Sequence, residues 1–474
     1  MPKQIVIDPV TRIEGHGRIT IQLGDDGVVQ DAHFHVTQLR GFEKFCEGRP
    51  FEEMPSLMAR ICGICPVSHL IAAAKACDAL LAVRIPPTAI QLRRIINMAQ
   101  IVQSHALSFF HLSSPDLLLG MDFDPVQRNI FGVLQRYPDL ARDGIRLRRF
   151  GQQIIEWLGG KRIHPSWVVP GGVNEPLTEQ RRNQILATIP EALEIIVRTL
   201  DWFRTAMGIF QEEIATFANF PTLYMGLVNE DGEPDYYDGR LRVVDSAGNV
   251  INDGIEAAEY HDYIGEYVEP HSFLKSPFYI PLGYPEGIYR VGPLARLNVA
   301  DRLNEPKAYE EWSAFRELGR RAVQSSFYYH YARLIEILFC IERLRTRLSR
   351  PDILNKHVRA YAEPNSFEGV GMSEAPRGML LHHYKIDEQG LVTWANLIIA
   401  TGHNNLAMNR GVLQAAKHFV KGNKIEEPML NRVEAVIRCY DPCLSCSTHA
   451  IGKMPLHVQL VSADGGILDE IKRG

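Results

Sequence analysis

The chain has 474 residues, of which 46% are hydrophobic and 23% charged, an ordinary globular composition with enough apolar surface for a large core. Its formal net charge of −5 argues against nucleic acid or an anionic membrane as the main partner. No apolar run reaches about 18 residues, so we expect no membrane span. The first residues alternate like a strand and lack the pattern of a signal peptide, so we expect a cytoplasmic protein.

The N-terminal half changes from β-like to helical periodicity. Residues 1–38 alternate apolar and polar side chains about a glycine-rich turn, which predicts a small antiparallel sheet. Residues 53–218 are mainly helical, with Pro66 at the first position of one helix and Pro87 before the next. The stretch 219–306 is rich in Gly, Pro and Tyr, and we expect an irregular or β-like excursion from the helical core.

Helical periodicity returns in the C-terminal half, over residues 308–348. Residues 370–449 predict a hairpin with its turn at 387–390, then helices and a cysteine motif. The pattern therefore predicts a mainly α fold of the α+β class, with a helical-bundle core and peripheral small antiparallel β elements. We expect one catalytic unit over 1–449, followed by a separate extension over 450–474 that alternates like two short strands.

The cysteines form two close pairs. Eight cysteines are too few for a disulfide scaffold, and close pairs in a reducing compartment are typical of metal ligands or redox groups. The pairs lie in Arg60-Ile-Cys-Gly-Ile-Cys-Pro-Val-Ser-His69 and Asp441-Pro-Cys-Leu-Ser-Cys-Ser-Thr-His449. The remaining four are expected to be buried free thiols: Cys46, Cys77, Cys340 and Cys439.

The surroundings of both pairs favour thiolates. Cys65 precedes Pro66 and is expected at the cap of a helix, and Asp441 followed by Pro442 resembles a second N-cap. Helix N-termini favour negative charge and lower the pKa of a thiol. Four thiolates indicate a soft metal site, and zinc, iron–sulfur, copper(I) and nickel all satisfy that chemistry. The pairs stand too far apart in the chain for a zinc ribbon.

Five motifs in order resemble the large subunit of [NiFe] hydrogenases, over essentially the whole chain. They are Asp8-Pro-Val-Thr-Arg-Ile-Glu-Gly-His16, Arg40-Gly-Phe-Glu43, the two cysteine motifs and Glu374-Ala-Pro-Arg-Gly378. Within the family, the stretches 41–57 and 61–81 look most like the soluble NAD-reducing group. This resemblance implies reversible heterolytic cleavage of H2, with the electrons passed to NAD⁺.

The resemblance also implies the metal ligands. Cys62 and Cys443 would be terminal ligands of nickel, and Cys65 and Cys446 would bridge nickel to an iron that carries carbon monoxide and cyanide. His69 would donate a hydrogen bond to a bridging sulfur.

Further residues match the family's proton-transfer and charged groups. The Cys443 thiolate would be the first proton acceptor and Glu14 the relay carboxylate. Arg377, with Pro376 beside it, would overhang the open metal position; a guanidinium is always protonated, so we expect electrostatic and positioning work from it. Asp116 and Asp441 would share that charged shell.

Three more residues match the family at the edge of the site. Glu43 and His449 would be ligands of a second, hard metal, usually magnesium. Thr401 would face the diatomic ligands, although the local sequence departs from the common family pattern. By contrast, His382 and His383 show no ligand spacing, and we expect ordinary strand or surface histidines there.

The resemblance implies partners, because the cysteines outside the two pairs form no iron–sulfur pattern, and no nucleotide-binding motif is found. We expect a small subunit with an iron–sulfur cluster, flavin- and NAD-binding diaphorase subunits, and nickel-insertion proteins. A maturation protease would cut after His449 and release 450–474. The alternatives are a hydrogenase that feeds a deazaflavin or a disulfide reductase, a structural zinc protein, and the related metal-free quinone-site subunit of respiratory NADH dehydrogenase.

Overall fold

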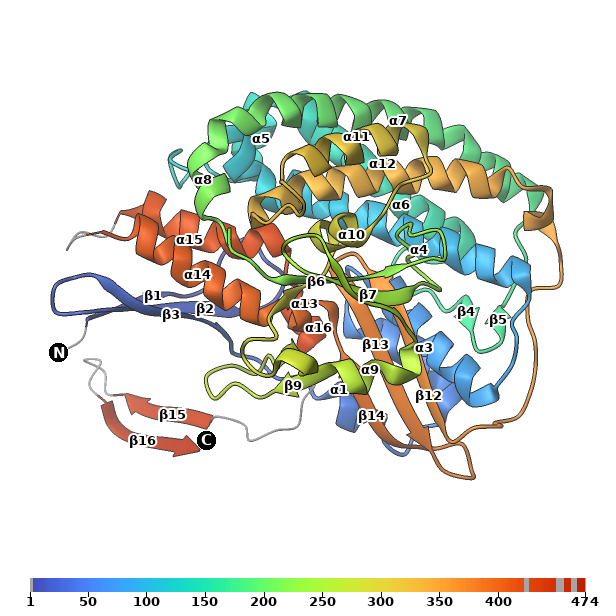
Figure 1. Cartoon of the computed structure of the whole chain (residues 1–474). Coiled ribbons are helices and arrows are strands. Elements are labelled where there is room, and N and C mark those ends of the chain that lie inside the picture. The colour runs from blue at the N-terminus through green and yellow to red at the C-terminus, as the bar shows by residue number, and fades with distance from the viewer. Residues whose placement is uncertain (1–2, 422–425, 449–455, 462–466, 474) are drawn as a thin grey trace.

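The computed structural model describes residues 3–421, 426–448, 456–461 and 467–473. Long helices gather in one layer, at the top of Figure 1, and short sheets lie below and beside them. The prediction of a mainly helical core with small antiparallel sheets is confirmed. Among the described residues no helix is both long and apolar enough to cross a membrane.

In the N-terminal sheet the first strand alternates between exposed and buried side chains, and the next two strands are mostly buried. The order of the sheet is β1-β2-β3, all antiparallel, and β3 packs against helix α14. The strands are β1 (Lys3–Ile7), β2 (Gly17–Leu23) and β3 (Val29–Val36), and the helix is α14 (Asn405–Phe419). The Asp8–Glu14 segment leaves β1 and reaches the C-terminal cysteine motif, where Glu14 forms an isolated parallel bridge with Cys443.

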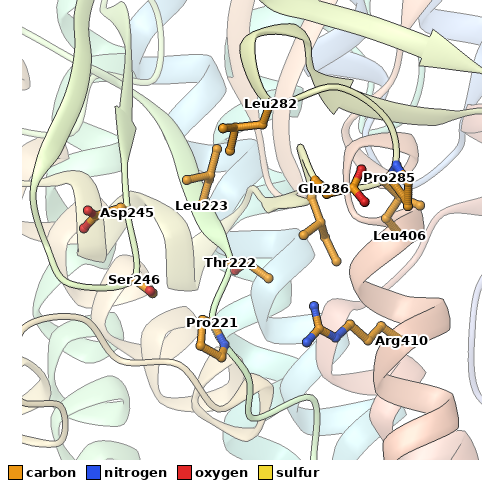
Figure 2. Close-up of a pocket in the computed structure, with 11 residues that line it drawn as sticks. Pro221, Thr222, Leu223, Asp245, Ser246, Leu282, Pro285, Glu286, Leu406 and Arg410 are labelled. Atoms are coloured by element: carbon orange, nitrogen blue, oxygen red, sulfur yellow. The ribbon is translucent and has the colours of Figure 1, made fainter.

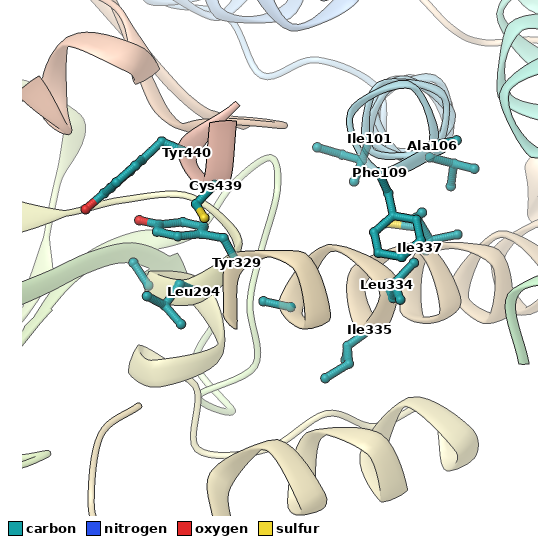
Figure 3. Packing of buried hydrophobic residues seen from close by; sticks show 14 of the residues in the cluster. Ile101, Ala106, Phe109, Leu294, Tyr329, Leu334, Ile335, Ile337, Cys439 and Tyr440 are labelled. Atoms are coloured by element: carbon teal, nitrogen blue, oxygen red, sulfur yellow. The ribbon is translucent and has the colours of Figure 1, made fainter. Parts of the chain in front are cut away.

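The helical core packs around α4, which contacts both α6 and α12. Its members are α4 (Pro87–Leu107), α6 (Pro138–Gly159), α7 (Glu179–Ala206) and α12 (Tyr329–Leu348). Figure 3 shows the contact between α4 and α12, where Ile101 and Ala106 face Leu334 and Ile337. These side chains are fully buried, so α4 and α12 are held together by close packing.

The excursion over 219–306 holds a four-stranded sheet of order β11-β6-β7-β8 and a two-stranded sheet of β9 (Ile264–Tyr267) and β10 (Ser276–Tyr279), and α10 follows them. The strands of the four-stranded sheet are β6 (Leu223–Val228), β7 (Arg240–Val244), β8 (Val250–Ile255) and β11 (Tyr289–Arg290), and α10 spans Pro293–Val299. Helix α10 packs on β6 and on α12 and so connects this sheet to the helical core.

The region 370–398 holds one strand more than the predicted hairpin. The strands β12 (Glu368–Ala375), β13 (Gly378–Ile386) and β14 (Val392–Ile398) form an antiparallel meander. The turn at 387–390 lies between β13 and β14 as predicted, and Pro376-Arg377 makes the second turn. Gly378 follows with φ 136°, and a Cβ there would lie 2.2 Å from Val291, so this turn requires glycine.

The chain ends in two helices and a hairpin. Helix α15 (Glu427–Tyr440) packs on α14 and leads to the cysteine motif. Beyond that motif, strands β15 (Leu456–Val461) and β16 (Ile467–Arg473) pair only with each other among the described segments, in line with the alternation of the tail.

Candidate metal centre

The two cysteine motifs meet at the start of two helices. Cys65 is the N-cap of α3 (Pro66–Leu81), with Cys62 one turn before it. Cys443 is the N-cap of the short helix α16 (Leu444–Ser447), and Cys446 lies within that helix. A proline at the first position of α3 pre-sets the helical backbone just after Cys65, so the sequence itself fixes where this helix begins.

The four thiol groups converge on one point. Their Sγ atoms all lie within 4.8 Å of one another, and all four side chains are buried. The Sγ atoms of Cys62 and Cys443 are 3.4 Å apart, and those of Cys65 and Cys446 are 3.5 Å apart. All four are free thiols, so the cluster has the donor set of a soft metal.

The local structure at Asp441 differs from the predicted N-cap. Asp441 ends α15 as its C-cap in the left-handed conformation, with φ 54° and ψ 55°. Asp and Asn tolerate this conformation better than most residues, so the chain reverses here and brings Cys443 toward Cys62. The prediction of a helix that starts at Pro442 was wrong, because α16 begins only at Leu444.

The thiols differ in acidity because they share one buried space. Hydrogen bonds from Cys443, Cys446 and Cys62, and also from His69, lower the pKa of Cys65 well below its usual value. Burial raises the pKa of Cys443 and of Cys446. A metal must therefore displace protons from the cluster, and its affinity rises with pH.

The other four cysteines are buried free thiols, as predicted. Burial raises the pKa of Cys46 and of Cys439 to about 12, and raises that of Cys77 and Cys340 well above its usual value. They therefore stay protonated and inert at neutral pH. The cysteine quartet is the only group of three or more potential metal ligands found among the described residues.

A small cavity of about 10 Å³ adjoins the cluster. That volume holds about one water-sized molecule, which suits a very small substrate. It is lined by Cys65, His69, Ala375, Pro376, Arg377, Leu380, Ile399, Ala400, Thr401, Cys443 and Cys446. Pro376, Arg377 and Thr401 thus line the same cavity as three of the four thiols.

Arg377 is held over this cavity by buried partners. Its guanidinium donates to the main-chain carbonyl of Asp441 and to the Asp441 carboxylate, at 3.0 Å for Nη2···Oδ2, and to Ser104 Oγ at 3.3 Å. Burial alone would lower the pKa of Arg377, but Asp441 and the nearby thiols raise it well above its usual value. The side chain is therefore a fixed positive charge and not a base.

Arg296 fixes the turn that carries Arg377. Its Nη1 donates to Glu374 Oε2 at 2.6 Å and to the carbonyl of Ala375 at 3.0 Å, and its Nη2 donates to the carbonyl of Pro376 at 3.0 Å. Nε and Nη2 also hold both oxygens of Glu336, at 2.6 and 2.7 Å. All five N–H donors of Arg296 are thus engaged, and two of them position the main chain just before Arg377.

Asp116 is buried among charged and polar partners. Its carboxylate pairs with Arg12 at 2.6 Å and with Arg438 at 2.9 Å, and accepts a hydrogen bond from Asn431. Burial would raise its pKa, but Arg438 and Arg12 lower it to about 2. The role predicted for Asp116 beside Arg377 stays a prediction: the side chain from this part of the chain that hydrogen-bonds to Arg377 is Ser104, on the preceding helix α4.

Glu14 lies against the second cysteine motif. Its carboxylate accepts hydrogen bonds from the backbone N–H of Ser445, at 3.0 Å, and from the Ser445 hydroxyl. Its own carbonyl accepts from Leu444 N at 3.1 Å. Glu14 is only partly buried, so it stands between the buried thiols and the outside of the molecule.

Thr401 acts on the backbone of the motif. Its Oγ1 accepts a hydrogen bond from Cys443 N at 2.9 Å, across a distance of 42 residues in the chain. Thr401 belongs to the short helix α13 (Ala400–His403), which follows β14 and forms one wall of the cavity.

Only one residue of the predicted second metal site is described. Glu43 accepts a hydrogen bond from Leu397 N at 2.9 Å, and Lys275 Nζ lies 3.7 Å away, a cation that already offsets its charge. Burial raises the pKa of Glu43 to about 7. The other predicted ligand, His449, lies outside the described residues, although the carbonyl of Thr448 accepts from Arg40 N and Gly41 N at this corner.

Several residues of the site gave no recognisable signal in the sequence. Ser104, Arg296, His382 and Tyr384 are all fully buried near the cluster, yet no motif surrounds them. A wide surface pocket of about 520 Å³ (Figure 2) shares no lining residue with the thiol cavity. Arg410 points into that pocket between apolar side chains that include Leu223 and Leu406.

Four buried thiols from opposite ends of the chain, beneath a fixed arginine, define a metalloenzyme with a soft-metal centre. The chain belongs to the nickel-dependent hydrogenase family, whose model matches residues 40–122 and 198–449. A second family model, described as HoxL-like, matches residues 4–39. The chain is therefore a [NiFe] hydrogenase large subunit, and the family assignment made from the five motifs is confirmed.

The relatives are similar over nearly their whole length. The chain is 42% identical to the beta subunit of the NAD-reducing hydrogenase HoxS of Cupriavidus necator, with 100% of both chains covered. It is 41% identical to a subunit of the F420-non-reducing hydrogenase vhc of Methanococcus voltae, covering 98% of this chain and 99% of the relative.

Solved structures show the same fold. A NAD⁺-reducing [NiFe]-hydrogenase in the H2-reduced state superposes with a TM-score of 0.92 at 43% identity, over 94% of this chain and 99% of the other. The Ni-Fe-Se hydrogenase from D. vulgaris Hildenborough, at 24% identity, superposes with a TM-score of 0.76 over 95% and 100% of the two chains.

Proposed function

We propose that this chain carries out reversible heterolytic cleavage of H2 at a nickel–iron centre, with the electrons delivered through partner subunits to NAD⁺. The single observation that supports this most is the convergence of four buried Sγ atoms within 4.8 Å. Dihydrogen is a poor ligand, and a nickel–iron centre supplies the soft, electron-rich metals that polarise it.

The ligand roles follow the family resemblance. By that resemblance, Cys62 and Cys443 would hold the nickel, and Cys65 and Cys446 would be shared between the nickel and an iron with carbon monoxide and cyanide ligands. The geometry supports one shared centre for all four thiols, since their Sγ atoms lie within 4.8 Å of one another and the shortest distance, 2.6 Å, joins Cys443 to Cys446. The nickel-dependent family also favours this centre over a structural zinc site and over a metal-free quinone-site subunit.

Proton removal uses groups of this chain. The thiolate Sγ of Cys443 accepts the proton, and the Glu14 carboxylate moves it outward. Glu14 is supported in this role because it bonds to Ser445, two residues from Cys443, and is partly exposed. Arg377, held in place by Asp441, puts a fixed positive charge beside the cavity that would receive the substrate. The buried walls of this cavity exclude water.

Electrons must leave through another subunit, because no second cluster of metal ligands occurs among the described residues. We propose a small subunit with an iron–sulfur cluster and flavin- and NAD-binding diaphorase subunits; the Cupriavidus relative, by its name one subunit of an NAD-reducing hydrogenase, supports further subunits and NAD⁺ as the acceptor. This chain is also similar to subunits of F420-non-reducing hydrogenases. A different electron acceptor, such as a disulfide reductase, is therefore the second candidate. Hydrogen-dependent reduction of NAD⁺ by the co-purified complex distinguishes the two.

Four further predictions complete the proposal. Nickel-insertion proteins load the centre, and a maturation protease cuts after His449 and removes 450–474. Magnesium at Glu43 and His449 stays a prediction, since Lys275 already pairs with Glu43 and His449 lies outside the described residues. A cytoplasmic location likewise stays a prediction from the sequence.

Infrared spectroscopy together with nickel and iron analysis of the purified complex tests the centre. We expect bands of bound carbon monoxide and cyanide, where protein does not absorb, and one nickel for each chain. The variant Cys446→Ala should lose both. The matched variant Cys439→Ala, at a buried thiol outside the quartet, should keep both. Zinc in place of nickel and iron, without the bands, would contradict the proposal.

A further inference from the structure

A row of buried hydrogen bonds leads from the cysteine cluster into the meander. Tyr384 Oη lies 2.6 Å from His382 Nδ1, and His382 Nε2 lies 3.2 Å from His69 Nδ1. His69 in turn hydrogen-bonds to Cys65. The side chains of Tyr384, His382 and His69 are at most 1% exposed, so no solvent competes for these bonds. His382 lies on a strand, as expected, and is fully buried in this row.

The fold brings these residues together from distant segments. His382 and Tyr384 are two residues apart on β13 and therefore point to the same face of the meander. That face packs on α3, where His69 lies one turn after Cys65. The packing of the meander on α3 therefore aligns the three rings in a row.

When both imidazoles are neutral, only one arrangement of donors and acceptors in this row lets His69 donate a hydrogen bond to a thiolate at Cys65. A neutral imidazole has one N–H donor and one acceptor nitrogen. If His69 donates from Nε2 to the Cys65 sulfur, its Nδ1 must accept, so His382 must donate from Nε2. His382 Nδ1 then accepts from the Tyr384 hydroxyl. Burial supports this direction, because it raises the pKa of Tyr384 well above its usual value and keeps the phenol protonated as a donor.

We propose that His382 and Tyr384 are positioning residues that fix the tautomer of His69, so that its N–H is always aimed at the Cys65 sulfur. The inference rests on the proposed function, in which Cys65 bridges the two metals. A hydrogen bond to a ligand sulfur withdraws electron density from the metal, and partners behind the donating histidine hold its ring in place.

The same strand offers a matched control. His383, the next residue, bears the same type of contact on the opposite face: its Nδ1 lies 2.9 Å from Tyr260 Oη. Its Nε2 lies 2.7 Å from the carboxylate of Glu368, a side chain that is about half exposed. His383 therefore leads toward the surface and not toward the cysteine cluster. Tyr260→Phe therefore removes an equivalent buried tyrosine–histidine bond without touching the row that ends at Cys65.

Infrared spectroscopy of the purified complex tests the role of Tyr384. In Tyr384→Phe, His382 loses the phenol as donor to Nδ1, which weakens its preference to donate from Nε2 toward His69. The weakened N–H···S bond leaves more electron density on the metals, so the carbon monoxide band should shift to lower wavenumber. Tyr260→Phe should leave the band in place, and nickel content and thermal unfolding should show that both variants are folded and loaded.

A rescue experiment separates the tautomer from a merely structural effect. In His382→Gln, the amide N–H₂ replaces the imidazole Nε2–H as donor to His69 and does not depend on the phenol. Adding Tyr384→Phe in that background should therefore shift the band no further.

Three outcomes would overturn the inference. The first is an unmoved band in Tyr384→Phe, and the second is an equal shift in Tyr260→Phe. The third is a shift from Tyr384→Phe of the same size with glutamine at position 382. A wild-type complex without carbon monoxide and cyanide bands would instead contradict the proposed function itself, and with it this inference.

Discussion

Replacing Arg296 with lysine should separate the stability of the chain from the placement of Arg377. Lysine keeps the positive charge between Glu336 and Glu374 but has three donors in place of five. At least two of the five observed hydrogen bonds must therefore be lost. We expect these to be the two bonds to the main-chain carbonyls of Ala375 and Pro376, because the lysine ammonium is drawn to the two carboxylates. The turn that carries Arg377 then loses its fixed position.

The expected magnitude follows from the type of bond. A hydrogen bond from a charged donor contributes roughly 1.5–3 kcal/mol, so two lost bonds predict a loss of about 3 kcal/mol or more in stability. The catalytic effect is separate: a displacement of about 1 Å in a positioned group lowers turnover by roughly 10²-fold. Arg296→Lys should therefore lower kcat in hydrogen-dependent dye reduction by roughly that factor, at unchanged nickel content.

Arg93 provides the control, because it is equally buried and also engages its guanidinium fully. It bonds to Asp78, Tyr237 and the carbonyls of Gly172 and Val169, away from the thiols. Arg93→Lys should lower the thermal-unfolding midpoint about as much as Arg296→Lys but leave kcat unchanged. Equal kcat in the two variants, with equal loss of stability, would refute the positioning role of Arg296.

Three other predictions follow from single contacts. Glu14→Gln should stop H/D exchange while the metals stay bound, and full exchange in that variant would eliminate the relay role. Because Arg438 and Arg12 lower the pKa of Asp116 to about 2, below its usual 3.8, the ionised carboxylate stabilises the fold above that range and loses its effect as pH falls through it. Asp116→Asn should therefore cost about 2 kcal/mol near neutral pH, measured by thermal unfolding, with the difference shrinking toward about pH 2. A uniform difference at all pH values would contradict this account. Mass spectrometry of active enzyme should find a chain that ends at His449; an active chain that reaches residue 474 would defeat the maturation prediction.

Local chemistry made much of the fold predictable. Pro66 and Pro87 each stand at the first turn of a helix, and α3 and α4 begin there because proline pre-sets the backbone. The alternation of apolar and polar residues in the first strands, and the turn residues at 387–390, are likewise local in the sequence, and both were predicted from it. The division of 370–398 into three strands was not predicted, and the turn at Pro376-Arg377 requires glycine at position 378 because a Cβ there would meet Val291, which is remote in sequence.

The site divides in the same way. The sequence by itself indicated the four thiols, because two close cysteine pairs carry the chemistry of a soft metal, and the resemblance of its motifs to the family implied Glu14 and Arg377. Only the tertiary structure decided which partners hold them: Ser104 beside Arg377, and His382 behind His69. Such contacts join side chains that lie far apart in the chain, and no local pattern records which of many buried polar residues will meet once the helices and the meander pack.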